Sequence, residues 1–214
     1  MSRTNFKPGT LLNPLPVVMA AVDDGECGAN IITIAWTGIV NSNPPMTYIS
    51  VKPERYSYEL LKKAGNFTVN LVTQELAKAA DYCGVRSGKN VDKWADTGLE
   101  PEASVMIPSP GIKQSPLILE CEIKEIKKYP SHHMFVAEIV NVSVADDIVD
   151  EKGKICLEDA GLVSYCHGEY LGISKRSLGN SQVFTVAKVS WQIWFFGDEA
   201  EDKKTAEQRE KSKA

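Results

Sequence analysis

The feature that most constrains the fold is a succession of short apolar, β-branched runs separated by turns. In the segment Ile31–Val40, residues such as Thr33 and Thr37 alternate with larger apolar ones. That period of two is typical of a half-buried strand. Strands are predicted over Val17–Val22, Ile31–Val40, Met46–Val51, Phe67–Val72, Leu117–Ile126 and Met134–Val144. A short, proline-containing connection joins the last two, which indicates an antiparallel hairpin.

Helical signals are fewer. The segment Ser57–Ala64 begins with a serine suited to cap a helix and stops at Gly65. The segment Gln74–Tyr82 is rich in helix formers. Because the helices do not alternate with the strands as in parallel βαβ units, we predict a mainly β fold, an antiparallel barrel with inserted helices.

The charge balance argues against a nucleic-acid partner. The net charge is -4, the pI is about 5.5, and glutamates offset the cluster Lys124, Lys127 and Lys128. Neither a signal peptide nor a membrane span is predicted, since the first residues are polar and Pro14 and Pro16 break the next apolar run. The cysteines form no CxxC pair and are expected as reduced thiols, which indicates the cytoplasm.

Motifs of the common catalytic machineries are missing. The chain has no GxGxxG after a strand, no GxSxG and no HExxH. The stretch Gly84–Lys89 is one residue shorter than a phosphate loop, and no Ser or Thr follows its lysine, so no triphosphate site is expected. The adjacent His132 and His133 would point to opposite faces of a strand, and no metal site is expected.

An ordered series of residues is more informative. In chain order it comprises Asn30, Thr33-Ile34-Ala35-Trp36, Pro44-Pro45, Ser50-Val51, Arg55-Tyr56-Ser57, Asn66-Phe67-Thr68-Val69-Asn70, Ser87-Gly88, Asp92-Lys93-Trp94 and His132. In this order and spacing, from about Pro14 to about Tyr170, the sequence resembles the flavin-reductase-like FMN-binding split-barrel family, and within it the flavoredoxins. The resemblance implies an antiparallel Greek-key split barrel with flanking helices and bound FMN.

Three residues have the chemistry that the FMN phosphate needs. Arg55, Ser57 and Lys93 offer guanidinium, hydroxyl and ammonium donors. Arg55 and Ser57 stand where a strand ends and a helix begins, so helix N–H groups can add to the site. Taken alone, Arg55 and Lys93 would each be read as exposed surface charges. The family order favours the phosphate interpretation for the set.

The resemblance assigns further residues to the flavin ring. The strand between Asn30 and Trp36 would lie along the ring, with backbone amides on its pyrimidine edge; core packing is an equal alternative for Trp36. His132 matches a histidine expected near the flavin, and Tyr165 is the candidate for stacking on the ring, with dimer packing as the alternative. Together with the three phosphate residues, the residues expected to bind the cofactor are Asn30, Thr33, Trp36, Ser50, Val51, His132 and Tyr165.

The implied function is a redox flavoprotein, expected as an NAD(P)H-dependent flavin reductase that passes electrons through bound FMN. No catalytic side chain is predicted, because the isoalloxazine ring performs the chemistry. The alternative is a flavoredoxin-type electron carrier, which serves a redox partner protein and has little nicotinamide activity. A weaker reading is a non-catalytic ligand-binding module. The family implies a homodimer with FMN near the subunit interface.

The C-terminal part differs in composition from the rest. Trp191–Phe196 is strongly aromatic, and Asp198–Ala214 is almost entirely charged or small. We therefore expect an FMN-binding domain over residues 1–190 and, over 191–214, an aromatic segment followed by a charged tail. The aromatic segment is expected to be covered by its own barrel and by a second subunit.

Overall fold

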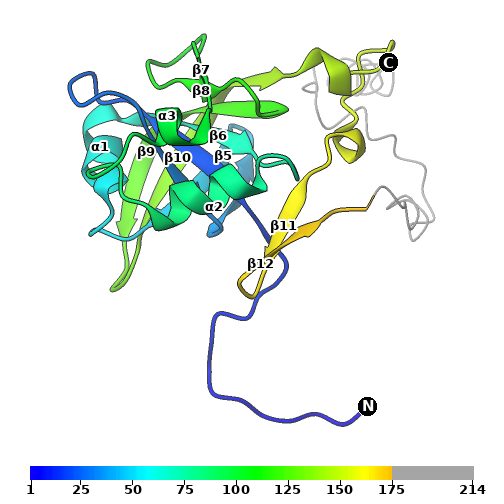
Figure 1. The fold of residues 1–214 in the computed structure, drawn as a ribbon. Helices are drawn as coiled ribbons and strands as arrows, with labels where there is room; N and C mark the ends of the chain where they lie inside the picture. The colour runs from blue at the N-terminus through cyan, green and yellow to red at the C-terminus, as the bar shows by residue number, and fades with distance from the viewer. Residues whose placement is uncertain (175–214) are drawn as a thin grey trace, which may run out of the picture. The chain divides into compact units, whose positions relative to one another are not determined.

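The computed structural model describes residues 1–174, and its centre is a seven-stranded antiparallel sheet (Figure 1). In spatial order its strands are β3 (Asn30–Ile34), β2 (Val18–Val22), β6 (Asn66–Leu71), β9 (Leu117–Lys128), β10 (His133–Val144), β5 (Pro45–Val51) and β4 (Thr37–Ser42). The edge strands β3 and β4 are consecutive in the chain, and between them Trp36 accepts a backbone hydrogen bond from Ser50 at 2.9 Å. The sheet therefore curls, and the predicted antiparallel Greek-key split barrel with flanking helices is confirmed.

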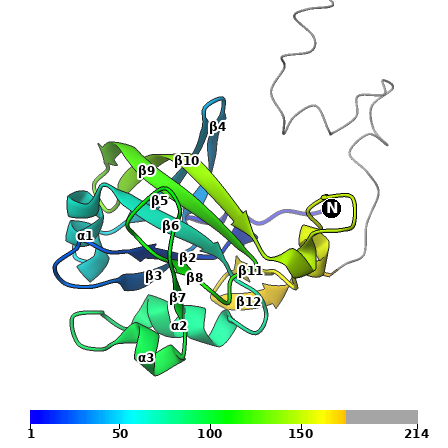
Figure 2. The ribbon, with the colours of Figure 1, turned by 90° about the horizontal axis from the view of Figure 1, so that it is seen from above.

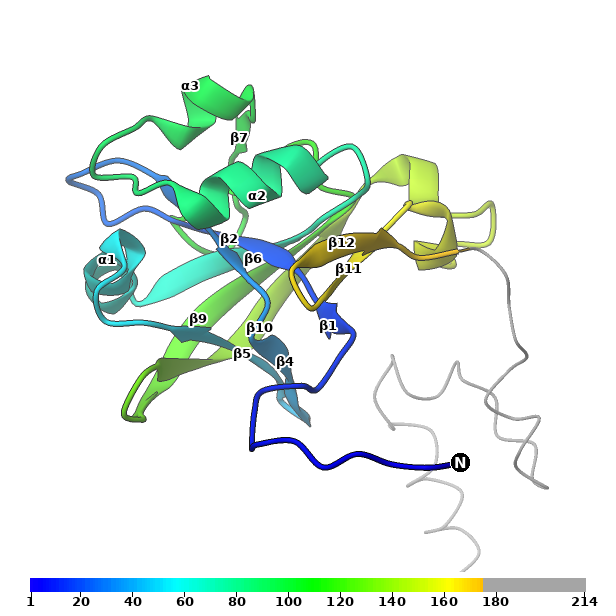
Figure 3. The same cartoon turned by 60° about the horizontal axis from the view of Figure 1, so that its bottom comes forward.

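Three helices flank this sheet: α1 (Tyr56–Ala64), α2 (Ala77–Val85) and α3 (Lys93–Thr97). Figures 2 and 3 show α2 and α3 together on the outside of the sheet, beside β2 and β3. Two small sheets complete the described part. One contains β1 (Leu15–Pro16), β11 (Val163–Cys166) and β12 (Glu169–Gly172). The other pairs β7 (Pro101–Glu102) with β8 (Gly111–Ile112).

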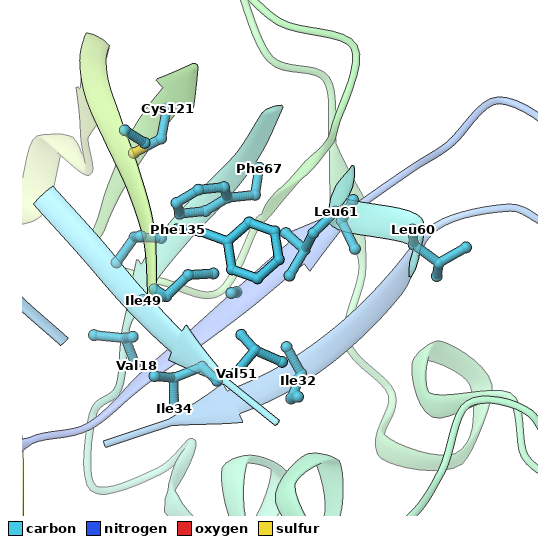
Figure 4. Close-up of a cluster of buried hydrophobic side chains, with 14 of the residues drawn as sticks. Val18, Ile32, Ile34, Ile49, Val51, Leu60, Leu61, Phe67, Cys121 and Phe135 are labelled. Carbon is cyan, nitrogen blue, oxygen red and sulfur yellow. The ribbon is translucent and has the colours of Figure 1, made fainter. Parts of the chain in front are cut away.

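The core forms on both sides of β2, whose residues are all buried. Its alternate residues point in opposite directions: Val18 faces the barrel interior with Phe67 and Phe135 (Figure 4), and Met19 packs in the same cluster as Ala80 of α2. Burying a phenylalanine side chain contributes roughly 1.5–3 kcal/mol. Cover on both faces explains why this strand has an uninterrupted apolar sequence instead of an alternating one.

The single strand predicted over Ile31–Val40 is wrong, because the chain changes its pairing partner there. Ile34 pairs with Val18 of β2, whereas Thr37 already pairs with Ile49 of β5. The chain thus leaves one edge of the sheet and joins the other within two residues. Alternation describes both parts correctly but does not reveal which strand each part pairs with.

The helix predicted over Gln74–Tyr82 is displaced along the chain. A turn precedes it, in which the Thr73 hydroxyl accepts a hydrogen bond from the Leu76 backbone N–H at 3.3 Å. At its other end α2 continues through Gly84, where a Cβ would lie 3.3 Å from the Thr33 Cβ. Gly84 is therefore a position of close contact between helix and strand and does not end the helix.

Helix α1 ends at Gly65 as predicted, with a left-handed φ of 68° and a bond from its N–H to Leu61. Its beginning differs from the prediction. Arg55 occupies the N-cap position without a capping bond from its side chain, and Ser57 lies inside the helix. Ser57 is buried and is therefore available for a role other than capping.

The predicted hairpin between β9 and β10 is confirmed, with Lys128 paired to His133 and a bond of 3.0 Å from the Tyr129 N–H to the His132 carbonyl. The aromatic segment Trp191–Phe196, the charged tail and the boundary at residue 190 lie outside the described residues. Among residues 1–174, no helix is long and apolar enough to cross a membrane.

Candidate functional site

A cavity of about 220 Å³ lies where the N-terminus of α1, the end of α2 and the loop at residues 86–88 meet. Its charged lining residues are Lys52, Glu54, Arg55, Arg86 and Lys93. We call it the basic cavity, since a single carboxylate faces four cationic side chains. The lining also includes the uncharged residues Ile32, Tyr56, Ser57, Cys83, Ser87 and Gly88. This donor set suits a small anion such as a phosphate group.

Lys93 is a buried part of this cavity and not an exposed surface charge, with only 4% of its surface accessible. Its Nζ donates to the carbonyl oxygens of Ile31 in β3 at 2.6 Å and of Cys83 in α2 at 2.8 Å. Burial lowers the pKa of the Lys93 ammonium to about 8; Cys83 opposes this shift and Arg55 adds to it. An ammonium has three donors, so one remains for an anion in the cavity.

Ser57 is positioned by a buried hydrogen bond. The Asn30 amide donates from Nδ2 to the Ser57 Oγ at 2.7 Å. Because that oxygen accepts, the hydroxyl proton of Ser57 can be donated to another acceptor. Gly88 packs against Asn30 and Tyr56: a Cβ there would collide with the Asn30 Oδ1 and lie 3.0 Å from the Tyr56 ring. Strand β3, helix α1 and the loop at residues 86–88 therefore fix one another's positions.

Arg55 stands at the start of α1 with an exposed side chain whose Nη1 donates to the Gly84 carbonyl at 3.3 Å. The guanidinium thus connects the beginning of α1 with the end of α2. The positive end of the α1 dipole lies beside it, which favours an anion at this place. Of the predicted phosphate contacts, Arg55, Ser57 and Lys93 all line the basic cavity.

An aromatic pair includes the residue that directly precedes β4. The rings of Trp36 and His132 are 4.2 Å apart between centroids, and Trp36 is 38% exposed, so it is a surface residue and not core. Burial lowers the pKa of His132; Lys52 and Arg55 add to this shift, and Glu54 opposes it. Among the other residues predicted to bind the cofactor, Ser50 donates from its backbone N–H to the Trp36 carbonyl, and Val51 pairs with His133 next to His132.

None of the residues predicted to contact the flavin beyond the phosphate set lines the basic cavity, and two of them have partners elsewhere in the fold. The Thr33 hydroxyl donates to the Ala80 carbonyl of α2 at 2.5 Å. Tyr165 lies in β11, where its ring meets that of Tyr170 edge-on, with centroids 5.6 Å apart. Neither residue lines the basic cavity of the single chain, and their contact with a flavin stays a prediction.

Some cavity residues were not assigned to the site from the sequence. The stretch Gly84–Lys89, rejected as a triphosphate loop, supplies Arg86, Ser87 and Gly88 to the lining, and Lys52 enters from the end of β5. The combination of glycine, serine and basic residues was the available signal. Spacing rules for one particular phosphate loop could not identify it, because this loop follows a helix and not a strand.

Other reactive groups of the described part have structural environments. Burial raises the pKa of the Cys83 thiol to about 11 and that of Cys121 to about 12, so both stay protonated. The histidines diverge as predicted: His133 contacts the Tyr58 hydroxyl through Nδ1 at 2.6 Å, whereas His132 contacts Trp36. Within residues 1–174, no cluster of three or more His, Cys, Asp or Glu residues could hold a metal ion.

Comparisons with known proteins agree with this architecture. A family model described as a flavin reductase-like domain matches residues 11–174. A flavoredoxin of Desulfovibrio vulgaris (Miyazaki F) is similar, with a TM-score of 0.80 and 25% identity over 87% of this chain and 100% of that one. For a flavoredoxin from Methanosarcina acetivorans the TM-score is 0.78 and the identity 26%, over 85% and 96%. A protein of Archaeoglobus fulgidus is 29% identical over 126 residues, which are 59% of this chain and 71% of that one. The chain belongs to the flavin reductase-like family.

Proposed function

We propose that this protein binds FMN and passes electrons through it as an NAD(P)H-dependent flavin reductase. The observation that carries the proposal is the basic cavity, where Arg55, Ser57 and Lys93 bring guanidinium, hydroxyl and ammonium donors together from α1 and α3. A phosphate dianion matches these donors in charge and hydrogen-bonding capacity. The donor set therefore fits the phosphate end of FMN.

The aromatic pair Trp36 and His132 supports a place for the flavin ring. The rings of Trp36 and His132, whose planes are tilted by 43°, offer aromatic surface near Lys52, and Lys52 also lines the basic cavity. FMN, when bound, supplies the acceptance and release of electrons at its isoalloxazine ring. The chain's own residues bind the phosphate, orient the ring and set its electrostatic surroundings.

A flavoredoxin-type electron carrier is the second candidate, and the two similar flavoredoxins favour it. Such a carrier would receive electrons from a redox partner protein and would react little with a nicotinamide. Either function would operate in the cytoplasm, as the sequence indicates.

We further propose that the protein is a homodimer. Beside Trp36, the edge strand β4 projects from the sheet (Figure 2) and exposes Ile39 by 73% and Val40 by 50%. Exposed apolar residues on an edge strand favour contact with another chain. A second copy that covers this edge would also cover the aromatic pair on which the ring is proposed to lie.

Two measurements test the proposed function. Purified protein titrated with FMN and with riboflavin should bind both and bind FMN more tightly, and Arg55→Ala should weaken FMN far more than riboflavin. Arg3→Ala, an exposed arginine outside the cavity, is the matched control. An unchanged flavin spectrum and fluorescence on titration would contradict flavin binding. Equal losses of both ligands in Arg55→Ala would separate this residue from the phosphate.

Stopped-flow mixing of the FMN-loaded protein with NADH and with NADPH separates the two candidate functions. Rapid bleaching of the flavin absorbance is expected of the reductase. A flavin that resists both nicotinamides but is bleached by a reduced protein carrier would assign the electron-carrier function instead.

A further inference from the structure

The first residues of the chain form an extended arm that leaves the body of the protein ahead of β1 (Figure 3). Every residue from 1 to 12 is exposed. In the described part of the chain, these residues make one hydrogen bond, a local one from the Leu11 N–H to the Gly9 carbonyl at 3.0 Å. The arm therefore starts from a fixed point, since β1 pairs with β11, but makes no hydrogen bond to the body within residues 1–174.

The arm exposes three large apolar side chains to water. They belong to Phe6, Leu11 and Leu12, and Phe6 and Leu12 are each 82% exposed. Several exposed apolar side chains on one short segment favour contact with another surface. Pro8 and Pro14 restrict the backbone of the arm, which lowers the conformational entropy that is lost when the arm docks. The arm is therefore suited to bind an apolar surface in an extended form.

The edge strand β4 offers such a surface. A β-bulge between Ile39 and Asn41 interrupts its register with β5, and the two consecutive residues Ile39 and Val40 are both exposed. Edge strands are commonly protected by charged residues, and β4 has none among residues 37–42. The edge therefore presents two neighbouring apolar side chains and no charge that would repel an apolar partner.

The arm and β4 both extend from the lower side of the molecule in Figure 3. In a symmetric dimer the interface is isologous, so each copy gives and receives the same contact. An apolar arm and an apolar edge on one side of the chain meet this condition, because two copies can exchange their arms and close the assembly. Twelve extended residues span up to about 40 Å, which is enough to cross to a neighbouring copy.

We propose that the arm of one copy docks through Phe6, Leu11 and Leu12 on the exposed edge of β4 in a second copy, and that the second copy's arm docks on the first in return. This inference rests on the proposed homodimer and names the contact that forms it. The receiving surface is the apolar pair Ile39 and Val40. Each dimer thus contains two identical contacts between an arm and an edge.

Sedimentation of the full-length protein over a range of micromolar concentrations tests the proposal. The wild-type protein should be a dimer. Leu12→Glu should raise the dimer dissociation constant by about tenfold or more, because it places a charge against the apolar edge. Thr4→Glu adds the same charge at an exposed polar position of the arm and should leave the constant unchanged.

A mixture of two variants identifies which surfaces meet. Leu12→Glu damages the arm, and Ile39→Glu damages the edge. At a concentration where each variant alone is monomeric, an equimolar mixture should form dimers that are weaker than the wild-type dimer. The reason is that the intact arm of the Ile39→Glu chain can still dock on the intact edge of the Leu12→Glu chain, which restores one of the two contacts.

The outcomes separate this proposal from the homodimer on which it rests. If Leu12→Glu dimerises as tightly as the wild type, or if the mixture stays monomeric while the wild type is dimeric, the arm does not dock on β4 and the homodimer proposal stands. A wild-type protein that is monomeric over the whole range would overturn both and leave the arm to a different partner. Flavin titrations of the same samples test the cofactor proposal independently of either result.

Discussion

Lysines are almost never buried without a partner that takes up the charge. Lys93 is buried, and its Nζ donates to two carbonyl oxygens, which carry only partial charges. The lowered pKa of about 8 expresses the cost of keeping this ammonium charged. Since the folded pKa lies below the ordinary value of 10.5, the cost is fully present below about pH 8 and is relieved as the pH rises from there towards 10.5. An anion in the cavity would offset the same cost.

This gives a pH dependence for FMN binding. The charged form of Lys93 binds a phosphate, so FMN affinity should fall as the pH rises through about 8, by up to about tenfold between pH 7 and pH 9. Riboflavin lacks the phosphate, and its affinity should stay level over this range. Titrations at a series of pH values measure both, and Lys93→Met should abolish the slope for FMN. A parallel decline for riboflavin would show that another group causes it.

Gly88 is required by contact and not by its backbone angle. A methyl group there would lie 2.0 Å from the Asn30 Oδ1 and 3.0 Å from the Tyr56 ring. In Gly88→Ala the Asn30 amide must move and lose its bond to Ser57, so we expect FMN to bind about tenfold more weakly or worse. Flavin titration with a thermal melt checks this. Gly9→Ala, whose new methyl meets its nearest atom at an ordinary 3.8 Å, should bind FMN as the wild type does.

At the scale of secondary structure, the sequence predicted strands better than the points where strands change partners. The runs that became β2, β5, β6, β9 and β10 were placed within two residues of their observed ends. The break between β3 and β4 was missed because both parts alternate in the same way, and only the pairing of Ile34 with Val18 and of Thr37 with Ile49 distinguishes them. Periodicity records which face a residue takes and not which neighbour it has.

In the site, too, the sequence predicted which residues take part but not the contacts that position them. Arg55, Ser57 and Lys93 came from the ordered resemblance and line one cavity. The bond from Asn30 to Ser57 and the burial of Lys93 could not be predicted, since both depend on the packing of β3 against segments far along the chain. Local signals had even indicated a capping role for Ser57. The packing of β3 against α1 instead places Ser57 inside the helix, where it bonds to Asn30.

Strand β9 holds the loop at residues 103–109 through a buried carboxylate. Glu120 accepts from the backbone N–H groups of Val105 at 2.9 Å and Met106 at 2.7 Å, and from the Asn141 amide at 2.8 Å. Burial alone would raise the pKa of Glu120, but the hydrogen bonds from Val105, Asn141 and Met106 outweigh it and hold the pKa below its ordinary 4.5. The folded carboxylate is therefore stabilising above about pH 4.5, and this contribution is lost as the pH falls through the lowered value.

Glu120→Gln should accordingly destabilise the fold by about 1–3 kcal/mol at neutral pH, because an amide nitrogen would replace an oxygen that accepts hydrogen bonds. Denaturant unfolding measures the loss, which should shrink in acid, where the wild-type carboxylate is itself protonated. Glu125→Gln, an exposed glutamate of the same strand, is the control and should change little. A loss that is equal at neutral and acid pH would contradict the role of the charge.

At the scale of the whole molecule, the proposed homodimer requires that the exposed edge of β4 lie in the subunit interface. Ile39→Glu puts a charge on its exposed apolar edge and should shift the protein from dimer to monomer at micromolar concentration without unfolding it. Sedimentation or light scattering measures the mass. Val85→Glu changes an equally exposed apolar residue at the end of α2 and should leave the mass unchanged. A dimeric Ile39→Glu protein would remove this edge from the interface.

The enclosure of β2 has a consequence for how the molecule opens. This strand has paired neighbours on both sides, β3 and β6, and a packed cluster over each face. Its amide protons can reach solvent only when the sheet and the helix layer separate together, so they should exchange with deuterium at the rate of global unfolding. The β4 amides have a partner on one side only and should exchange by local fraying. The part of the chain proposed to meet a partner is thus the part that opens first.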